Sequence, residues 1–309
     1  MTSAPLVPGP VTVRVPAKVN LELLVGPLRD DGYHDLSTVY QAVSLYDDVT
    51  VGAADAWGVS VSGALAEGVP TDDDNIALKA ARLVAERYSG TPVHVSIRKG
   101  IPVAGGMAGG SADAAATLVA LDHLWDLGLD REDLEEIASE LGSDVPFLVA
   151  GGTAMGSGRG ELLAPVLARG TYHWVLALAE GGLSTPAVYA ECDRLRDGAD
   201  VPDPVATPAL MAALRTGDPH ELAPQLVNDL QEAAVSLRPD LGEVLSAGME
   251  YGALGGIVSG SGPTIAFLVD GTEAGIDLAV ALTASGVVRD VRRASGPVHG
   301  AHVIHHRVD

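Results

Sequence analysis

The stretch Pro102-Val-Ala-Gly-Gly-Met-Ala-Gly-Gly-Ser-Ala-Asp-Ala-Ala-Ala116 joins an alternating apolar segment, 93–97, to an alanine-rich run that continues to residue 127. The alternation predicts a strand, and the alanine-rich run predicts a helix from about residue 111. Glycines let backbone N–H groups approach a phosphate, and a helix amino terminus carries partial positive charge. The stretch therefore predicts a phosphate-binding loop, in which Ser111 could cap the helix, contact a phosphate or bind Mg²⁺. A tight turn with Ser111 as a plain cap would use the same residues, because the loop is neither a Walker A motif nor a strict G-x-G-x-x-G.

Two further stretches could supply the acceptor side of a transfer reaction. Pro16-Ala-Lys-Val-Asn20 places Lys18 and Asn20 on one face of a strand, in a chain with only three lysines. Leu141-Gly-Ser-Asp-Val-Pro146 places Asp144 at a turn, because a residue that precedes proline disfavours the helical conformation. Asp144 could act as a general base or as the charge partner of Lys18. An exposed sheet face and an ordinary aspartate turn remain the alternatives.

Three smaller stretches carry possible recognition residues. Four glycines fall between residues 255 and 262, which suggests that this backbone closely approaches another group. The loop 156–160, Gly-Ser-Gly-Arg-Gly, is interpreted as a hairpin connection. Tyr33 and His34 follow a predicted turn at 30–32 and could stack on and hydrogen-bond to a base, although ordinary surface residues look the same.

The remaining pattern predicts an α+β protein of two domains, 1–165 and 166–309, because strands and helices alternate without a regular βα repeat. Pro16 is expected to interrupt the first strand region. Strands are expected over 11–15, 20–25, 39–51, 59–62, 93–97, 256–258, 264–269 and 287–292, and a hairpin over 147–150 and 153–155. Helices are expected over 75–88, 111–127, 133–141, 208–214, 220–227, 230–237 and 272–284.

The composition excludes several classes of protein. A net charge of −22 argues against binding to nucleic acid or to an anionic membrane surface. The single cysteine, Cys192, allows no intrachain disulfide, and no signal peptide or membrane-spanning run is evident. We therefore expect a cytoplasmic protein that binds neither nucleic acid nor membrane. The charge also requires a local positive site if the ligand is an anion.

In chain order, Pro16-Ala-Lys-Val-Asn20, the glycine loop and Gly260-Ser-Gly-Pro-Thr264 resemble the three motifs of the GHMP kinase superfamily. Arg29-Asp-Asp-Gly-Tyr-His-Asp-Leu36 and Leu141–Pro146 resemble the branch whose acceptor carries a cytidine diphosphate group. The resemblance extends over about residues 14–268. It implies a ribosomal-protein-S5-like amino-terminal domain and a ferredoxin-like carboxy-terminal domain. The implied activity is the phosphorylation of the 2-hydroxyl of a cytidine-diphosphate-linked methylerythritol, with ATP and Mg²⁺. This reaction belongs to the non-mevalonate route to isoprenoid precursors. The enzyme is expected to be a monomer or weak homodimer.

The resemblance also implies roles for individual residues. Asp144 would accept the hydroxyl proton, and Lys18 would orient it and offset charge, with Asn20 nearby. Tyr33 and His34 would hold the cytosine, Tyr189 would stack on its opposite face, and Thr185 would lie near the erythritol. Asn75 and Lys99 would lie near the base and ribose of ATP. Ser111 would contact the metal ion. The phosphates of ATP would contact Pro102, Val103, Ala104, Gly105, Gly106, Met107, Ala108, Gly109, Gly110 and Ser111.

Some residues depart from the family pattern, and two other functions compete. Ala104 and Ala108 stand where glycines are usual, and Asp113 stands where asparagine is common, so Asp113 is expected to point away from the phosphates or toward Mg²⁺. A homoserine or mevalonate kinase would not need Tyr33 and His34, because its substrate carries no base. A catalytically silent nucleotide-binding regulator would not need Asp144.

Overall fold

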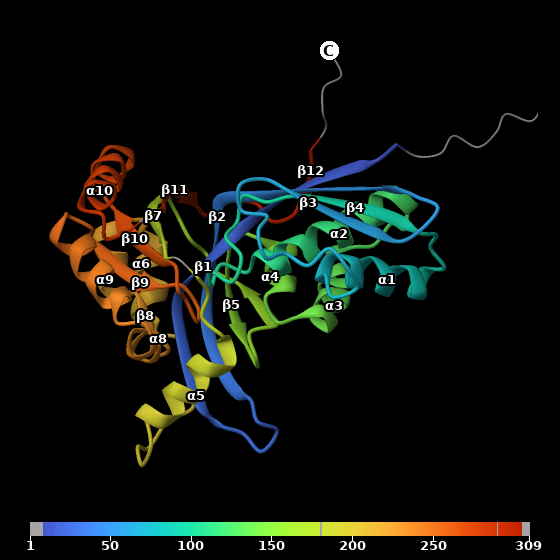
Figure 1. Ribbon diagram of the computed structural model, residues 1–309. Helices are drawn as coiled ribbons and strands as arrows, with labels where there is room; N and C mark the ends of the chain where they lie inside the picture. Colours follow the sequence, from blue (N-terminus) through green and yellow to red (C-terminus); the bar gives the residue numbers. More distant parts are fainter. Residues whose placement is uncertain (1–8, 180, 289, 305–309) are drawn as a thin grey trace, which may run out of the picture.

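The strands of this protein form two sheets that lie next to each other (Figure 1). The structure is a computed structural model and describes residues 9–179, 181–288 and 290–304. Among these residues, no helix is long and apolar enough to cross a membrane. Helices and strands are mixed in both halves of the chain, so the α+β prediction is confirmed.

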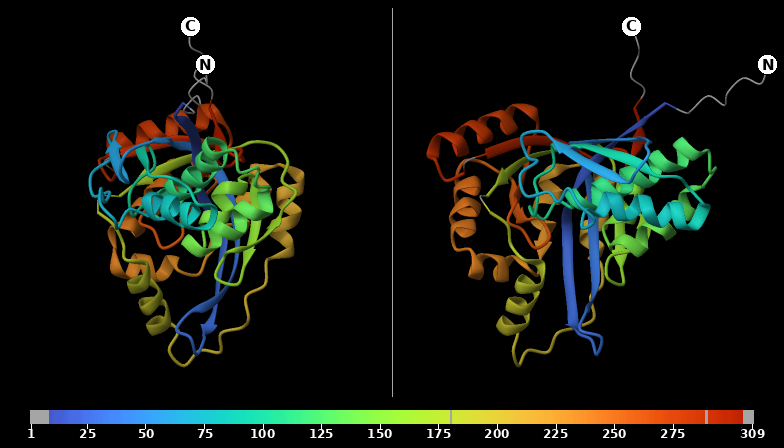
Figure 2. Two further views of the ribbon diagram at one scale, coloured as in Figure 1. Left: turned by 90° about the vertical axis from the view of Figure 1, so that its right-hand side faces the viewer. Right: turned by 45° about the vertical axis from the view of Figure 1, so that its right-hand side comes forward.

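The larger sheet has the strand order β12-β1-β2-β4-β3, with β5 on β2, β6 on β5 and β8 on β1. Its long antiparallel hairpin of β1 and β2 reaches past the body of the molecule (Figure 2). The bounds of its strands are β1 (Val11–Leu28), β2 (His34–Ala53), β3 (Gly58–Ser62), β4 (Val93–Arg98), β5 (Thr153–Ser157), β6 (Leu162–Pro165), β8 (Val227–Asn228) and β12 (His302–Val303).

One face of this sheet is covered by α1 (Ile76–Tyr88), α2 (Gly109–Trp125), α3 (Arg131–Leu141) and α4 (Val145–Ala150) (Figure 1). The alanine-rich α2 is buried on nearly all sides, because it packs against β1, β2, α1 and α4 at once. Small side chains allow this close approach of backbones. The fold thus holds the amino terminus of α2 in a fixed place beside β1.

The smaller sheet is antiparallel, with the order β11-β7-β10-β9. It contains β7 (Tyr172–Leu178), β9 (Gly255–Val258), β10 (Ile265–Val269) and β11 (Asp290–Gly296). The helical segments of this half are α5 (Thr185–Leu195), α6 (Pro208–Thr216), α7 (Pro219–Leu222), η1 (Ala223–Gln225), α8 (Gln231–Leu237), α9 (Asp240–Glu250) and α10 (Thr272–Ser285). Trp174 Nε1 donates to Gln41 Oε1 at 3.0 Å, and this buried bond joins the two sheets. The predicted boundary at 165/166 stays a prediction, since β8 and β12 return to the first sheet.

Two expectations about secondary structure are wrong, and a third is wrong in part. The helix expected over 220–227 ends with α7 at Leu222, because Pro224 follows and the chain continues as η1 and then as the strand β8. Pro16 does not interrupt β1, because it lies at a register shift where the missing N–H is tolerated. Residues 147–150 belong to α4 rather than to a strand. A short, fully buried apolar run has no polar face to reveal its period, and Pro146 suits the first turn of a helix. β7, α5 and α9 were not expected.

Candidate active site

A cavity of about 400 Å³ lies where the amino terminus of α2 meets β1 and the β9–β10 loop. We call it the central cavity. It is lined by Lys18, Asn20, Leu23, Leu36, Tyr40, Ile76, Ala104, Gly105, Gly106, Ala108, Gly109, Gly110, Ser111, Ser143, Asp144, Arg159, Leu183, Thr185, Gly260, Ser261 and Gly262. The three stretches compared with the superfamily motifs therefore meet in one place, together with Asp144.

The glycine loop presents the first turn of α2 to this cavity. The helix begins at Gly109, two residues before the predicted start, so Ser111 lies inside the first turn and is not the cap. The first N–H groups of a helix have no intrahelical acceptor and favour an anion. Ala104 and Ala108 have φ angles of 51° and 60°, in the left-handed region that glycine favours. The backbone path thus stays accessible to alanine, at a cost of about 1–2 kcal/mol per residue.

The third glycine cluster packs against this loop. Gly106 has φ +74°, and a Cβ placed on it would lie 2.1 Å from the carbonyl oxygen of Ser259. Ser259 Oγ donates to Gly106 O at 3.0 Å, and Thr264 N donates to Gly105 O at 3.2 Å. A Cβ on Gly260, which has φ +55°, would lie 3.2 Å from Lys18 Nζ. The close approach expected of this cluster is thus an approach to the glycine loop and to Lys18.

Lys18 and Asp144 form an ion pair in the lining of the central cavity. Lys18 Nζ lies 3.8 Å from Asp144 Oδ2 and donates to Asn20 Oδ1 at 2.6 Å. The Asn20 amide donates in turn to Thr38 Oγ1 at 2.8 Å, which fixes its orientation. Tyr40 pairs with Asn20 across β1 and β2, so its side chain lies on the same face, 5.6 Å from Lys18 Nζ. Lys18 thus forms an ion pair with Asp144, while hydrogen bonds through Asn20 to Thr38 support the lysine from the other side.

Burial sets the electrostatics of this pair. Burial lowers the pKa of Lys18, and the Asp144 carboxylate opposes this change. The Lys18 side chain is 5% exposed and that of Asp144 is 28% exposed, so the carboxylate is the more accessible partner. Burial, followed by the charge of Asp144, raises the pKa of Tyr40 well above its usual value. Tyr40 therefore remains a neutral phenol beside the carboxylate.

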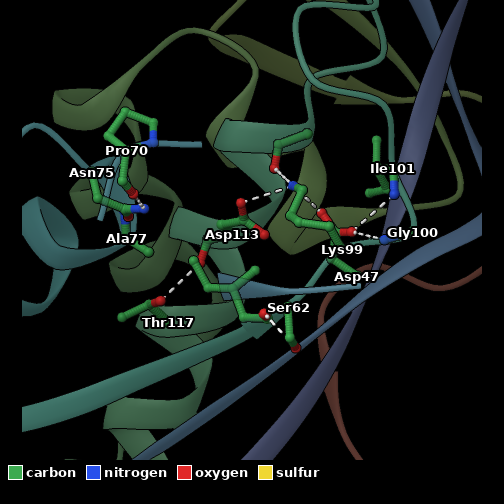
Figure 3. A network of polar contacts seen from close by, with 12 residues as sticks. Asp47, Ser62, Pro70, Asn75, Ala77, Lys99, Gly100, Ile101, Asp113 and Thr117 are labelled. Carbon is green, nitrogen blue, oxygen red and sulfur yellow. Dashed lines mark hydrogen bonds and ion pairs between the residues drawn. The ribbon is translucent and has the colours of Figure 1, made fainter. Parts of the chain in front are cut away.

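A second ionic cluster lies behind the glycine loop (Figure 3). Lys99 Nζ donates to Asp47 Oδ2 at 2.5 Å, to Asp113 Oδ2 at 2.9 Å and to Gly109 O at 3.2 Å. Asp47 Oδ1 accepts the N–H groups of Gly100 and Ile101 at 2.6 and 2.9 Å. These bonds connect β2, the end of β4 and the start of α2.

The cluster holds two carboxylates and one ammonium group in a buried place. Burial raises the pKa of Asp113 well above its usual value, with Lys99 opposing this and Asp47 adding to it. Lys99 has a raised pKa because the two carboxylates outweigh the effect of its burial. Asp113 Oδ1 is buried without a hydrogen-bond partner among the described residues.

Two residues expected near the base and ribose of ATP have other partners. The Lys99 side chain is 1% exposed and points to the cluster behind the loop. The Asn75 side chain caps α1 by accepting from Ala77 N at 2.9 Å, and donates to Pro70 O at 2.7 Å (Figure 3). Neither side chain lines the central cavity, whereas the neighbouring Ile76 does.

A second cavity, of about 620 Å³, is lined in part by aromatic side chains. We call it the aromatic cavity. It lies between the tip of the β1–β2 hairpin, α3 and α5, and is lined by Leu28, Gly32, Tyr33, His34, Leu36, Ser139, Glu140, Leu141, Gly142, Ser143, Arg159, Thr185, Pro186, Tyr189, Ala190 and Asp193. It brings Tyr189 together with the adjacent residues Tyr33 and His34, from which it lies far along the chain.

Tyr189 and His34 are held in a stacked pair. Their ring centroids lie 5.4 Å apart at an interplanar angle of 29°. His34 Nδ1 lies 2.8 Å from Gly26 O, and its Nε2 lies 3.4 Å from Asp193 Oδ2, so both ring nitrogens have fixed partners. Tyr33 is 54% exposed, in contrast to His34, which is 7% exposed. A planar base could reach both aromatic faces and the polar edge of this site.

The two cavities adjoin, since Leu36, Ser143, Arg159 and Thr185 line both. Of the residues expected in the site, Pro102, Val103 and Met107 do not line the central cavity, and Met107 lies in the core. Tyr40 and Arg159 line it without having been expected. The sequence feature that could have pointed to Arg159 as a site residue is its place between Gly158 and Gly160. The loop that contains these residues was correctly interpreted as a hairpin connection.

Two family models match this chain. The GHMP kinases N terminal domain matches residues 75–152, and the GHMP kinases C terminal domain matches residues 210–287. The 4-diphosphocytidyl-2-C-methyl-D-erythritol kinase of Nocardia farcinica is 60% identical over 97% of this chain and 98% of its own length. The enzyme with the same name from Mycolicibacterium smegmatis is 59% identical over 96% of this chain and 93% of its own length.

Solved structures give the same comparison. A crystal structure of 4-(cytidine 5'-diphospho)-2C-methyl-D-erythritol kinase matches with a TM-score of 0.75 and 32% identity, over 92% of this chain and 98% of the other. A homoserine kinase from Cytophaga hutchinsonii matches with a TM-score of 0.72 but only 18% identity, over 98% of this chain and 99% of the other, which shows a shared fold alone.

Proposed function

Because the chain belongs to the 4-diphosphocytidyl-2-C-methyl-D-erythritol kinases of the GHMP kinase family, we propose that the γ-phosphoryl group of ATP is transferred in its central cavity. The acceptor is the 2-hydroxyl of 4-diphosphocytidyl-2-C-methyl-D-erythritol. These kinases act in the non-mevalonate route to isoprenoid precursors. The observation that carries this proposal is that the Lys18–Asp144 pair lines the same cavity as the glycine loop. The cytosine would occupy the adjoining aromatic cavity, between Tyr33 and Tyr189 and beside His34.

Asp144 is the proposed base. The proton of the substrate hydroxyl passes to its carboxylate as the hydroxyl oxygen bonds to the γ-phosphorus and the bond from that phosphorus to ADP breaks. The Lys18 ammonium, 3.8 Å from Asp144, stabilises the negative charge that develops on the transferred group. Asn20 fixes the direction of the Lys18 side chain, and Thr185, which lines both cavities, lies where the acceptor must pass.

The phosphates of ATP would bind at the first turn of α2, over Gly105–Ser111. Helix N–H groups bind phosphate without a charged side chain at the loop. Lys99 and Asp47 would act as positioning residues, because they fix Gly109 and the end of β4 from behind and do not face the cavity.

Mg²⁺ would accompany ATP. Among the described residues, no group of three histidine, cysteine or acidic side chains could hold a metal ion. Mg²⁺ bound to phosphates keeps several waters and needs only one or two protein oxygens, so the Ser111 hydroxyl at the edge of the cavity fits such an ion. The ion would neutralise phosphate charge.

We also propose a cytoplasmic monomer or weak homodimer. Cys192 is a buried free thiol, which suits a reducing compartment.

The test is an Asp144→Asn variant in a coupled ADP-release assay, with phosphorus NMR to locate the product phosphate on the 2-hydroxyl. Loss of the base should lower kcat by about 10²–10⁴-fold, while the equilibrium constant for ATP binding stays within about twofold. Asp277→Asn, at an exposed site on α10, is the matched control. Loss of ATP binding, or a kcat near that of the control, would contradict the role of Asp144. Turnover of homoserine or mevalonate in place of the cytidine substrate would contradict the proposed acceptor.

A further inference from the structure

Arg159 lies at the junction of the two cavities. It is in the turn between β5 and β6, where Gly158 and Gly160 have φ angles of +70° and +106°. These two glycines adopt the left-handed conformation and make the turn tight, so that Arg159 is exposed between them before the chain returns along β6. Of the four residues that line both cavities, Arg159 alone carries a charge.

The contacts of Arg159 leave its guanidinium group at the surface of the site. Its central carbon lies 5.3 Å from the centroid of the Tyr33 ring, which is a cation–π contact. Its Nε lies 3.9 Å from Glu161 Oε1, which is too long for a hydrogen bond, and Glu161 Oε2 accepts the backbone N–H of Arg159 at 2.7 Å. The side chain is 48% exposed. Arg159 is thus oriented along the aromatic cavity and remains accessible to a ligand.

The other charged side chains that line the two cavities do not favour the binding of a phosphate group at their junction. The aromatic cavity is lined by Glu140 and Asp193, and the central cavity by Asp144. Lys18 is buried and directed to Asn20 and Asp144. A ligand with phosphate groups between the cavities would therefore depend on Arg159 for a positive partner.

We propose that Arg159 binds the diphosphate bridge of the acceptor substrate. This inference rests on the proposed placement of the cytosine in the aromatic cavity and of the reacting hydroxyl at Asp144, since the diphosphate must then cross the junction. A planar guanidinium group suits two phosphate oxygens at once. Arg159 is in this view a binding residue for the acceptor and not a residue of the phosphoryl-transfer step.

The experiment compares Arg159→Met and Arg159→Lys with the wild-type enzyme, using cytidine 5′-diphosphate and cytidine as separate probes in calorimetric titrations. Loss of a charge-assisted hydrogen bond should weaken binding of the diphosphate roughly 10- to 100-fold, and leave the binding of cytidine within about twofold. In turnover, KM for the acceptor should rise by a similar factor, with kcat and KM for ATP nearly unchanged. Arg159→Lys should recover part of the diphosphate affinity, because it keeps the charge.

The matched control is Arg98→Met, which removes an arginine at the end of β4 whose side chain is 77% exposed. An unchanged ratio of diphosphate to cytidine affinity in Arg159→Met would overturn the proposal. A fall in kcat at constant acceptor KM would also overturn it, since Arg159 would then act on the transferred phosphoryl group. Absence of turnover in the wild-type enzyme would instead count against the proposed function, so the two failures are distinguishable.

Discussion

Replacement of Lys99 by methionine should destabilise the protein more than the loss of any surface lysine. The side chains of Lys99, Asp47 and Asp113 are 1%, 0% and 3% exposed. The substitution removes the cation and leaves two buried carboxylates and the Gly109 carbonyl without their donor. Breaking a buried ion pair by removing one partner costs about 3–5 kcal/mol. Against a total stability of about 5–15 kcal/mol, that is a large fraction.

The assay is urea unfolding at pH 7.5, followed by the fluorescence of the three tryptophans, with the melting temperature as a second measure. The melting temperature should fall by roughly 5–10 °C for a protein of this size. Lys79→Met is the matched control, because Lys79 is 52% exposed and its contact with Asp74 lies at the surface. A surface pair of this kind contributes about 0–1 kcal/mol.

The same variant separates a purely structural role from positioning of the phosphate loop. If Lys99 holds Gly109 in place, the folded fraction of Lys99→Met should bind ATP more weakly, at a temperature well below its melting point. Adding Asp113→Asn should restore part of the stability, since one unpaired carboxyl is removed. A loss of stability in Lys99→Met no larger than that in Lys79→Met would refute the stabilising role of the buried cluster. An unchanged ATP affinity in Lys99→Met would refute the positioning role of Lys99.

Two further predictions concern Asp113 and His34. Because burial raises the pKa of Asp113, the native carboxyl keeps its proton above the pH at which the unfolded chain releases it, and its contribution to stability is lost as the pH rises. Asp113→Asn should therefore have a higher free energy of unfolding in urea than the wild-type protein at pH 8, and this difference should shrink toward pH 4. A difference that grows on acidification would contradict the expected direction. His34→Ala should raise KM for the cytidine substrate about tenfold at nearly constant kcat, because it removes the polar edge of the aromatic cavity. His220→Ala, at an exposed site, is the control in the same kinetic assay, and a pure kcat effect at His34 would exclude a role in base binding.

The sequence predicted much of the site because its motifs are local. Lys18 and Asn20 share a strand face, and the glycine loop joins a strand to a helix, so each motif keeps its geometry within a few residues. A close approach of the backbone at 255–262 to another group was also predicted, but the group itself was not. Two glycines in a loop reveal that space is scarce, but not which segment occupies it.

The ionic cluster behind the loop could not be predicted in the same way. Asp47 and Lys99 are 52 residues apart, and they meet only because β2 and β4 pair with Asp48 opposite Arg98. A lysine that precedes a phosphate loop suggests a ligand contact, and only its burial against Asp47 and Asp113 reveals another role. The α4 helix was missed for a related reason, since its burial on every side removes the polar residues that would show a helical period.

Both proposed substrates are polyanions, and yet the protein carries a net charge of −22. Charges at the surface are screened over about 8 Å at physiological ionic strength, so most of the acidic residues affect the rate of encounter more than the bound state. Within the two cavities, the positive groups are few and separate: the first turn of α2, Lys18, and Arg159 at the junction. The Asp113 carboxyl, on α2, pairs with Lys99 and does not line the central cavity. An acidic chain can therefore bind two phosphate-bearing ligands, provided that each positive group serves a different part of them.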